Sequence, residues 1–111
     1  MDERTKMLIL FDIYGELLTE KQKTIMDYYY NDDLSLTEIG ENGKISRQAI
    51  HDTIKRCEKL LISYEDKLGV LQKNMQIKKT KAEISKMLHS LECNDNLEVI
   101  NSIISKLDEI N

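Results

Sequence analysis

The chain has 111 residues, no proline, only four glycines, and charged residues at 32% of its positions. This length fits one domain, or one domain with an extension, and the lack of helix breakers together with the high charge predicts an all-α protein. The formal net charge of −4 argues against nucleic-acid binding that depends on overall charge alone.

The charges are unevenly distributed, so an acidic chain can still carry a basic face. Residues 1–46 hold ten acidic and five basic side chains, whereas residues 67–86 hold six lysines and one glutamate. No apolar run approaches the roughly 20 residues that cross a bilayer, and Met1 leads into charged residues, not into a signal peptide. We therefore expect a cytoplasmic protein without membrane insertion, with Cys57 and Cys93 as free thiols.

Two helices are predicted at the start of the chain. Residues 4–18 carry apolar side chains at helical spacing, and a second helix begins at Thr19, which can form a capping box with Gln22. The side chains expected to face inward are Met7, Leu8, Phe11, Tyr14, Leu17 and Leu18 in the first helix, and Ile25, Met26 and Tyr29 in the second. The consecutive tyrosines 28–30 fit packing at the core boundary better than an aromatic platform for bases.

Residues 34–61 have the plan of a helix-turn-helix, which the rest of the chain is expected to support. Ser35 and Glu38 form a capping box that starts a short helix. A longer helix restarts after Ser46, which can cap it. Gly40 is predicted to lie where the two helices cross closely, with no room for a side chain larger than alanine. Apolar contacts between the helices are expected from Ile39, Ile45, Ile50 and Ile54.

The longer helix has one apolar and one polar side. Its apolar stripe consists of Ile50, Ile54, Cys57 and Leu61. The polar side chains predicted to contact DNA are Arg47, Gln48, His51, Asp52, Lys55 and Lys59. Arginine and lysine can bind guanine or phosphate, and glutamine can pair with an adenine edge, whereas Asp52 would accept from cytosine or repel phosphate. A solvated or protein-binding face of a plain helical hairpin is the alternative interpretation.

The same residues carry a resemblance. The run from Leu18 to Gln22, a helix, a short acidic turn, and then LSLTEIGE and ISRQAI resemble region four of bacterial sigma factors, over residues 17–62. The run SRQAIHDTIKRCEKLLISYEDKLG is more similar to the YlxM-type family of small bacterial proteins. In that family such a unit follows a short helix and precedes a helical tail. The chain departs from the family pattern at the turn, where Gly43 is expected to supply the permissive backbone and Lys44 follows it.

The resemblance implies two functions. Members of the YlxM-type family are proposed DNA-binding proteins, which implies a helix-turn-helix protein that regulates transcription. They are also proposed to act in the signal recognition particle pathway, because their genes neighbour those of its GTPase components. The resemblance thus implies an alternative, an accessory protein of that pathway acting through protein or RNA contacts. Only the promoter-reading part of a sigma factor is matched, so a complete sigma factor is not expected.

Beyond Leu61 the sequence predicts a helical extension. The apolar stripe continues in steps of three and four through Tyr64, Leu68, Leu71 and Met75. Gly69 is expected to mark a bend or a helix end. A helix from Thr80 and a last helix capped by Asn94 or Asp95 would form a C-terminal hairpin. We therefore divide the chain into residues 1–62 and 63–111 and predict that the second part forms a homodimer, which would place two DNA-reading units side by side.

Other chemistry is sparse in this sequence. Four lysines form a basic segment that is either a solvated helix face or a secondary phosphate contact, namely Lys73, Lys78, Lys79 and Lys81. His89 and Cys93 are spaced as half of a zinc site, but His51 and Cys57 would have to converge with them. No phosphate-binding glycine loop and no pairing of nucleophile with base stand out. We predict no metal, no cofactor and no enzyme activity.

Overall fold

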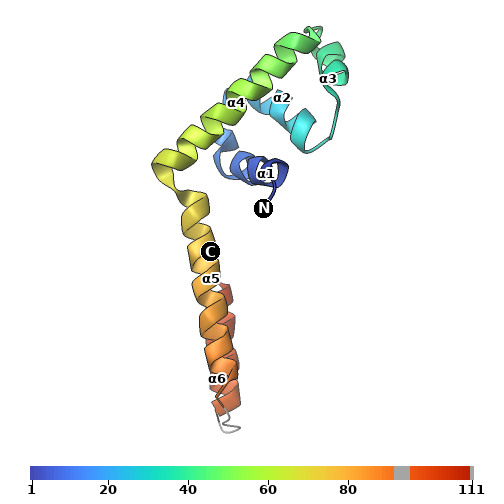
Figure 1. Ribbon diagram of the computed structural model, residues 1–111. Coiled ribbons are helices and arrows are strands. Elements are labelled where there is room, and N and C mark those ends of the chain that lie inside the picture. The colour runs from blue at the N-terminus through green and yellow to red at the C-terminus, as the bar shows by residue number, and fades with distance from the viewer. Residues whose placement is uncertain (92–95, 111) are drawn as a thin grey trace. The chain divides into compact units, whose positions relative to one another are not determined.

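The computed structural model describes residues 1–91 and 96–110, and no strand occurs among them. The predicted all-α class is confirmed (Figure 1), with α1 Glu3–Tyr14, the 3-10 turn η1 Gly15–Leu17, α2 Glu20–Tyr30, α3 Leu36–Gly43, α4 Arg47–Leu68, α5 Val70–His89 and α6 Leu97–Asp108. The chain divides into two compact units, Met1–Leu71 and Gln72–Asn111. The division follows Leu71, whereas the sequence suggested one after residue 62.

Both predicted capping boxes are confirmed at the starts of α2 and α3. The hydroxyl of Thr19 accepts a hydrogen bond from the backbone amide of Gln22 at 3.2 Å. The side-chain oxygen of Gln22 accepts one from the backbone amide of Thr19 at 3.0 Å. Ser35 and Glu38 form the same pair of bonds at 3.1 and 3.0 Å. Each box satisfies two backbone donors that the helix leaves without partners. The hydrogen bonds from Ser35 hold the pKa of the Glu38 carboxyl below its ordinary value.

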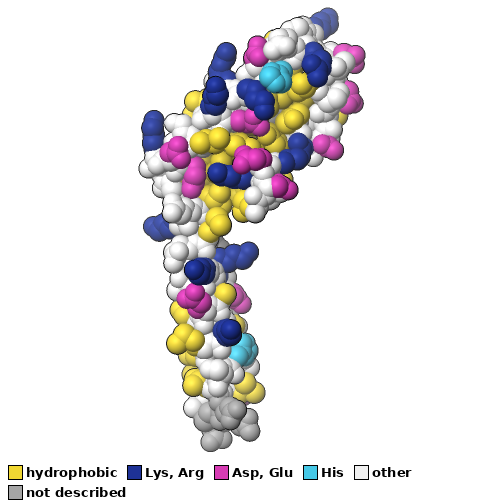
Figure 2. Space-filling model, viewed as in Figure 1, with side chains coloured by type: hydrophobic (Ala, Val, Ile, Leu, Met, Phe, Trp, Pro, Cys, Tyr) yellow, Lys and Arg dark blue, Asp and Glu magenta, His cyan; other side chains and the backbone are white. Residues whose placement is uncertain are grey.

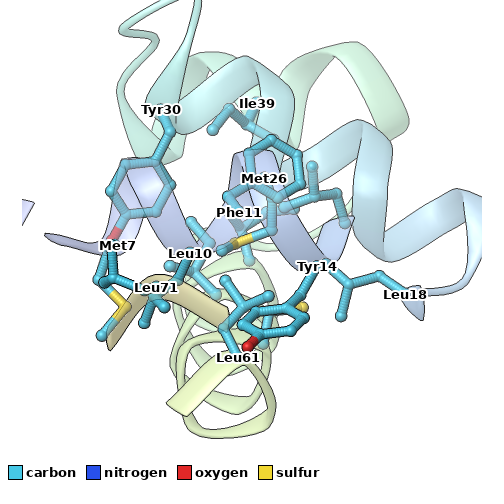
Figure 3. Packing of buried hydrophobic residues seen from close by; sticks show 14 residues of the cluster. Met7, Leu10, Phe11, Tyr14, Leu18, Met26, Tyr30, Ile39, Leu61 and Leu71 are labelled. Atoms are coloured by element: carbon cyan, nitrogen blue, oxygen red, sulfur yellow. The ribbon is translucent and has the colours of Figure 1, made fainter. Parts of the chain in front are cut away.

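The first unit is organised around α4, which contacts α1, α2 and α3. Figure 3 shows the buried side chains of these helices converging on one hydrophobic core. Its buried members are Met7, Leu10, Phe11, Tyr14, Leu18, Ile25, Met26, Tyr30, Ile39, Ile50, Ile54, Cys57, Leu61 and Leu71. The stripe predicted on the longer helix, from Ile50 to Leu61, is thus confirmed. It forms one wall of this core.

Of the predicted inward positions, two are wrong and one is confirmed in part. Leu17 is 55% exposed, because the chain tightens into the 3-10 turn after Tyr14 and its side chains leave the α-helical register. Leu8 is exposed as well, since the buried face of α1 passes through its neighbours, including the fully buried Leu10. In α2 the tyrosine that enters the core is Tyr30, while Tyr29 is only partly buried.

Gly69 ends α4, as the sequence suggested. It adopts a left-handed backbone with φ +63°, and its amide donates to the Glu65 carbonyl at 2.8 Å. The apolar stripe predicted to run on to Met75 therefore does not continue as one face. Leu68 is 60% exposed and Met75 is exposed, whereas Leu71, in the first turn of α5, is buried in the core.

The first turn of α5 is capped from within the first unit. The Glu65 carboxylate accepts from the Leu71 amide at 3.0 Å and from the Tyr14 hydroxyl at 2.6 Å. The same hydroxyl accepts from the Val70 amide at 3.2 Å. Desolvation and the bond to Glu65 raise the pKa of Tyr14. These bonds explain why the first unit extends to Leu71, beyond the predicted boundary.

The second unit is a hairpin of α5 and α6, two antiparallel helices that lie side by side (Figure 1). The Lys81 ammonium donates to the Ile110 carbonyl at 2.6 Å. The helix predicted to start at Thr80 is wrong as a separate element, because α5 runs unbroken from Val70 to His89 with no glycine or proline inside it. Asn94 and Asp95, the predicted caps, lie outside the described residues. None of the described helices is both long and apolar enough to span a bilayer.

Candidate nucleic-acid interface

A turn of three residues, 44–46, joins α3 to α4. Lys44 takes the left-handed conformation, with φ 54° and ψ 42°, and Gly43 is the last residue of α3. The prediction that Gly43 would supply the special backbone is therefore wrong by one residue, because the left-handed position follows the end of the helix. The Ile45 amide donates to the Gly40 carbonyl at 2.8 Å, which closes the turn onto α3.

Gly40, in α3, lies very close to the backbone of this turn. A Cβ atom at Gly40 would lie 2.4 Å from the carbonyl oxygen of Ile45. The predicted crossing is therefore tighter than expected, because the sequence left room for alanine and the structure leaves none. The neighbour is the turn backbone, which cannot move aside as a flexible side chain could.

α4 begins directly after this turn, where the Ser46 hydroxyl accepts from the Ala49 amide at 3.1 Å, as predicted. All six residues predicted to contact DNA lie on α4 and are exposed. At roughly 100° per residue they fall within an arc of about 140°, with Arg47 at the edge next to the buried stripe. Figure 2 shows one face of the molecule, where Lys and Arg side chains lie along the first unit with acidic ones among them. We call the six residues, Arg47, Gln48, His51, Asp52, Lys55 and Lys59, the α4 face.

Asp52 orders two neighbours on the α4 face. The amide nitrogen of Gln48 donates to the Oδ1 atom of Asp52 at 2.9 Å. The Nδ1 atom of His51 lies 3.5 Å from the same oxygen, at the limit of a hydrogen bond. Because the Gln48 amide is held by this bond, its conformational freedom is already reduced before any ligand arrives. Asp52 also places a negative charge within the face.

Lys55 is linked to the hydrophobic core through Glu58. Its ammonium lies 3.2 Å from one carboxylate oxygen of Glu58, and the Tyr30 hydroxyl donates to the other. The Glu58 side chain is only 17% exposed, so this carboxylate is largely removed from water. Burial and the bond to Glu58 raise the pKa of Tyr30 well above its ordinary value. Glu58 therefore partly neutralises the charge that Lys55 contributes to the α4 face.

Arg47 and Lys59 differ from Lys55, because within the described ranges neither forms an ion pair. Lys59 lines a shallow groove of about 460 Å³ beside the α4 face, together with Lys55 and Arg4. Arg4 stacks over the rings of Tyr29 and Tyr30, with centroid distances of 5.3 and 5.1 Å. Arg4 could not be predicted as a neighbour of the α4 face, since no local sequence pattern connects a residue of α1 with α4.

The lysines proposed as secondary phosphate contacts lie on α5. Lys73, Lys78 and Lys79 are exposed, whereas Lys81 is half-buried through its bond to Ile110. At roughly 100° per residue, Lys79 lies on the side of the helix away from Lys81. The four lysines therefore surround α5 and do not form one face.

The possible metal ligands do not assemble in the described part of the chain. No group of three His, Cys, Asp or Glu side chains there could hold a metal ion. Cys57 is fully buried in the core, which raises the pKa of its thiol. Cys93 lies outside the described residues, so the suggested pairing with His89 has no structural counterpart to describe.

Known proteins resemble the chain over nearly all of its length. The family model UPF0122, described as "Putative helix-turn-helix protein, YlxM / p13 like", matches residues 1–108. A UPF0122 protein of Clostridium kluyveri is 50% identical over 103 residues, which is 93% of each chain. A UPF0122 protein of Clostridium botulinum is 58% identical over 79 residues, 71% of this chain and 72% of the relative. One of Bacillus mycoides is 44% identical over 109 residues, 97% and 99% of the two chains.

Proposed function

Since the chain belongs to the UPF0122 family of YlxM/p13-like helix-turn-helix proteins, we propose that it binds duplex DNA through the α4 face and regulates transcription. One observation carries the proposal. The helix that follows the tight turn presents its polar side chains to solvent while its other side is fixed in the core. In helix-turn-helix proteins the N-terminal residues of this second helix contact base edges in the major groove. Such a protein acts in the cytoplasm and needs no catalytic activity.

The side chains of the α4 face are suited to contact different parts of a DNA duplex. Gln48, held by Asp52, suits an adenine edge, and Arg47, which has no ion pair among the described residues, suits guanine. Lys59 is available for phosphate, and Lys55 would have to leave Glu58 to reach one. With one or two phosphates neutralised by Lys59 and Lys55, the logarithm of affinity should fall with the logarithm of salt concentration with a slope of roughly −1 to −2.

Selection from random duplex DNA, carried out at two salt concentrations, tests this function. We expect an enriched sequence motif whose recovery decreases at the higher salt concentration, because phosphate contacts release counterions on binding. Recovery of random sequences only, at both salt concentrations, would contradict a sequence-reading role.

Arg47→Ala and Gln48→Ala should each weaken binding to the selected duplex about tenfold or more and relax the preference at one base pair. Each removes a side chain suited to base contacts, and such a contact contributes about 1–3 kcal/mol of discrimination. Fluorescence anisotropy with matched and mutated duplexes measures both effects. Arg56→Ala is the matched control, because Arg56 carries the same charge on the same helix but lies outside the α4 face. Equal losses in the two arginine variants would show a response to charge alone.

Asp52→Asn should strengthen DNA binding by about three- to tenfold. The amide oxygen of asparagine can still accept from Gln48, so the order of the face is kept, while a negative charge near phosphate is removed. The gain should shrink as salt is added, which anisotropy titrations at several salt concentrations would reveal. A loss of affinity would instead assign Asp52 to a base, as an acceptor from cytosine.

The second unit supports a homodimer as part of this proposal. Its hairpin leaves large hydrophobic side chains exposed. Among the described residues of this unit, only Ile100 is buried. The exposed ones are Met75, Met87, Leu91, Leu97, Val99, Ile103 and Ile110. A second copy that covers them would also provide two α4 faces for a two-fold DNA site.

A second candidate function rests on the lysines of α5, three of which are exposed. In this case the protein would be an accessory of the signal recognition particle pathway and bind RNA or protein through that helix. Neutralising Lys78, Lys79 and Lys81 together should then abolish binding, and changes on the α4 face should have no effect. The DNA-binding proposal expects the reverse order of effects, with the α5 lysines adding at most secondary phosphate contacts.

A further inference from the structure

α6 has two apolar sides, and the hairpin covers only one of them. Ile100 is buried, and Ile104 and Leu107, which follow at helical spacing, are half-buried on the side facing α5. Val99 and Ile103 are 58% and 39% exposed. They lie roughly a quarter of a turn around the helix from the first group. The hairpin therefore leaves a second apolar surface on α6 without a covering helix.

This second surface has a symmetric charge pattern. Glu98, Ser102 and Lys106 follow one another at intervals of four residues, so all three lie along one side of α6. With Val99 and Ile103 they line a shallow depression, and we call these five residues the α6 stripe. The two charges have opposite sign and lie at equal distances from Ser102. In the described ranges neither Glu98 nor Lys106 forms an ion pair.

We propose that the α6 stripe binds the α6 stripe of a second copy, antiparallel, with the two-fold axis passing at Ser102. This arrangement places Glu98 opposite the partner's Lys106, and Lys106 opposite the partner's Glu98. Val99 and Ile103 then pack between the two helices, as expected for an isologous interface. The inference rests on the homodimer proposed above and deepens it by assigning the interface and its orientation.

The charge pattern indicates that a second copy of the chain covers the α6 stripe. A helix with two charges of opposite sign, placed evenly about a small central residue, is complementary to its own reversed copy. Parallel pairing would place Glu98 against the partner's Glu98 and Lys106 against the partner's Lys106, which is unfavourable. At the centre the small Ser102 lets the two helices approach closely, and the apolar residues beside it are removed from water. The paired hairpins would form a four-helix bundle.

Charge reversal in the full-length chain tests both the interface and its orientation. Glu98→Lys and Lys106→Glu should each raise the dimer dissociation constant about tenfold or more, because each creates two like-charge contacts per dimer. An equimolar mixture of the two variants should regain the original affinity, since every contact in the mixed dimer joins opposite charges. Analytical ultracentrifugation over a concentration series measures all three. Asp108→Lys is the matched control, because Asp108 lies on α6 outside the stripe.

A cross-link at the axis provides the second measurement. In a background with Cys93→Ser, the variant Ser102→Cys should form an intermolecular disulfide on mild oxidation, since only residues on the axis approach their own copies closely enough. Ser105→Cys, on the same helix but off the stripe, should not.

The outcomes separate this inference from the function it rests on. A wild-type chain that stays monomeric at high micromolar concentration would overturn both the homodimer and the stripe. A dimer that is unaffected by either charge reversal would overturn the stripe alone and leave the homodimer standing. DNA binding by the α4 face is read separately, by anisotropy.

Discussion

Gly40→Ala should destabilise the first unit by about 3 kcal/mol, the upper end of the usual cost of overpacking. The new Cβ atom would lie 2.4 Å from the Ile45 carbonyl oxygen, so the turn between α3 and α4 would have to open. The better helix propensity of alanine returns at most about 1 kcal/mol. Urea denaturation followed by far-UV circular dichroism measures the change. Because the same turn orients α4, the affinity for a selected DNA duplex should fall as well.

Gly43→Ala is the matched control for this change, three residues along the same helix. The nearest atom to its Cβ would be the terminal methyl of Ile45 at 3.3 Å, which can shift by a few tenths of an ångström. The stability of this variant should stay within about 1 kcal/mol of the wild-type value, with alanine favoured by propensity. If the two variants were equally stable, the close approach at Gly40 would be wrong.

Leu61→Ala should also cost about 3 kcal/mol, within the range of 2–5 kcal/mol for removing a buried leucine side chain. Leu61 is completely buried in the core. Its truncation would leave a cavity between helices that are held by other contacts and cannot fully collapse. The midpoint of urea unfolding should shift accordingly, with little change in the slope, because the surface exposed on unfolding stays similar.

Leu68→Ala, on the same helix, tests whether burial and not residue type determines this loss. Leu68 is exposed, so its truncation should change stability by no more than about 0.5 kcal/mol. Comparable losses in the two variants would mean that the apolar stripe continues past Leu61 in solution, as its spacing alone suggested.

The comparison of Leu61 with Leu68 also shows what the sequence could predict. Local patterns were sufficient for the capping boxes and for the stripe on α4, because these depend on residues three or four positions apart. Periodicity failed beyond Gly69, since one left-handed residue changes the direction of the chain and moves every later side chain to a new face. The end of the helix was foreseen, but the position of Leu71 in the core of the first unit was not.

The candidate interface shows the same limit. The six residues of the α4 face follow from the sequence, because helical spacing places them on one side. Their partners do not. Glu58 accepts a hydrogen bond from the hydroxyl of Tyr30, which is 28 residues away in the sequence, and Arg4 of α1 stacks on the tyrosines of α2. Contacts of this kind depend on how the helices pack, which no short pattern encodes.

The backbone at position 69 disfavours L-amino acids because of their chirality and not because of their size. Its backbone is left-handed, yet nothing lies within 4 Å of the place a Cβ atom would occupy. An L-amino acid there is disfavoured by its own backbone, at a cost of about 1–2 kcal/mol. A mirror-image alanine would adopt this left-handed backbone without that strain, and it would restrict the unfolded chain more than glycine does. The open space beside Gly69 therefore does not relieve an L-amino acid, because the cost arises within its own backbone.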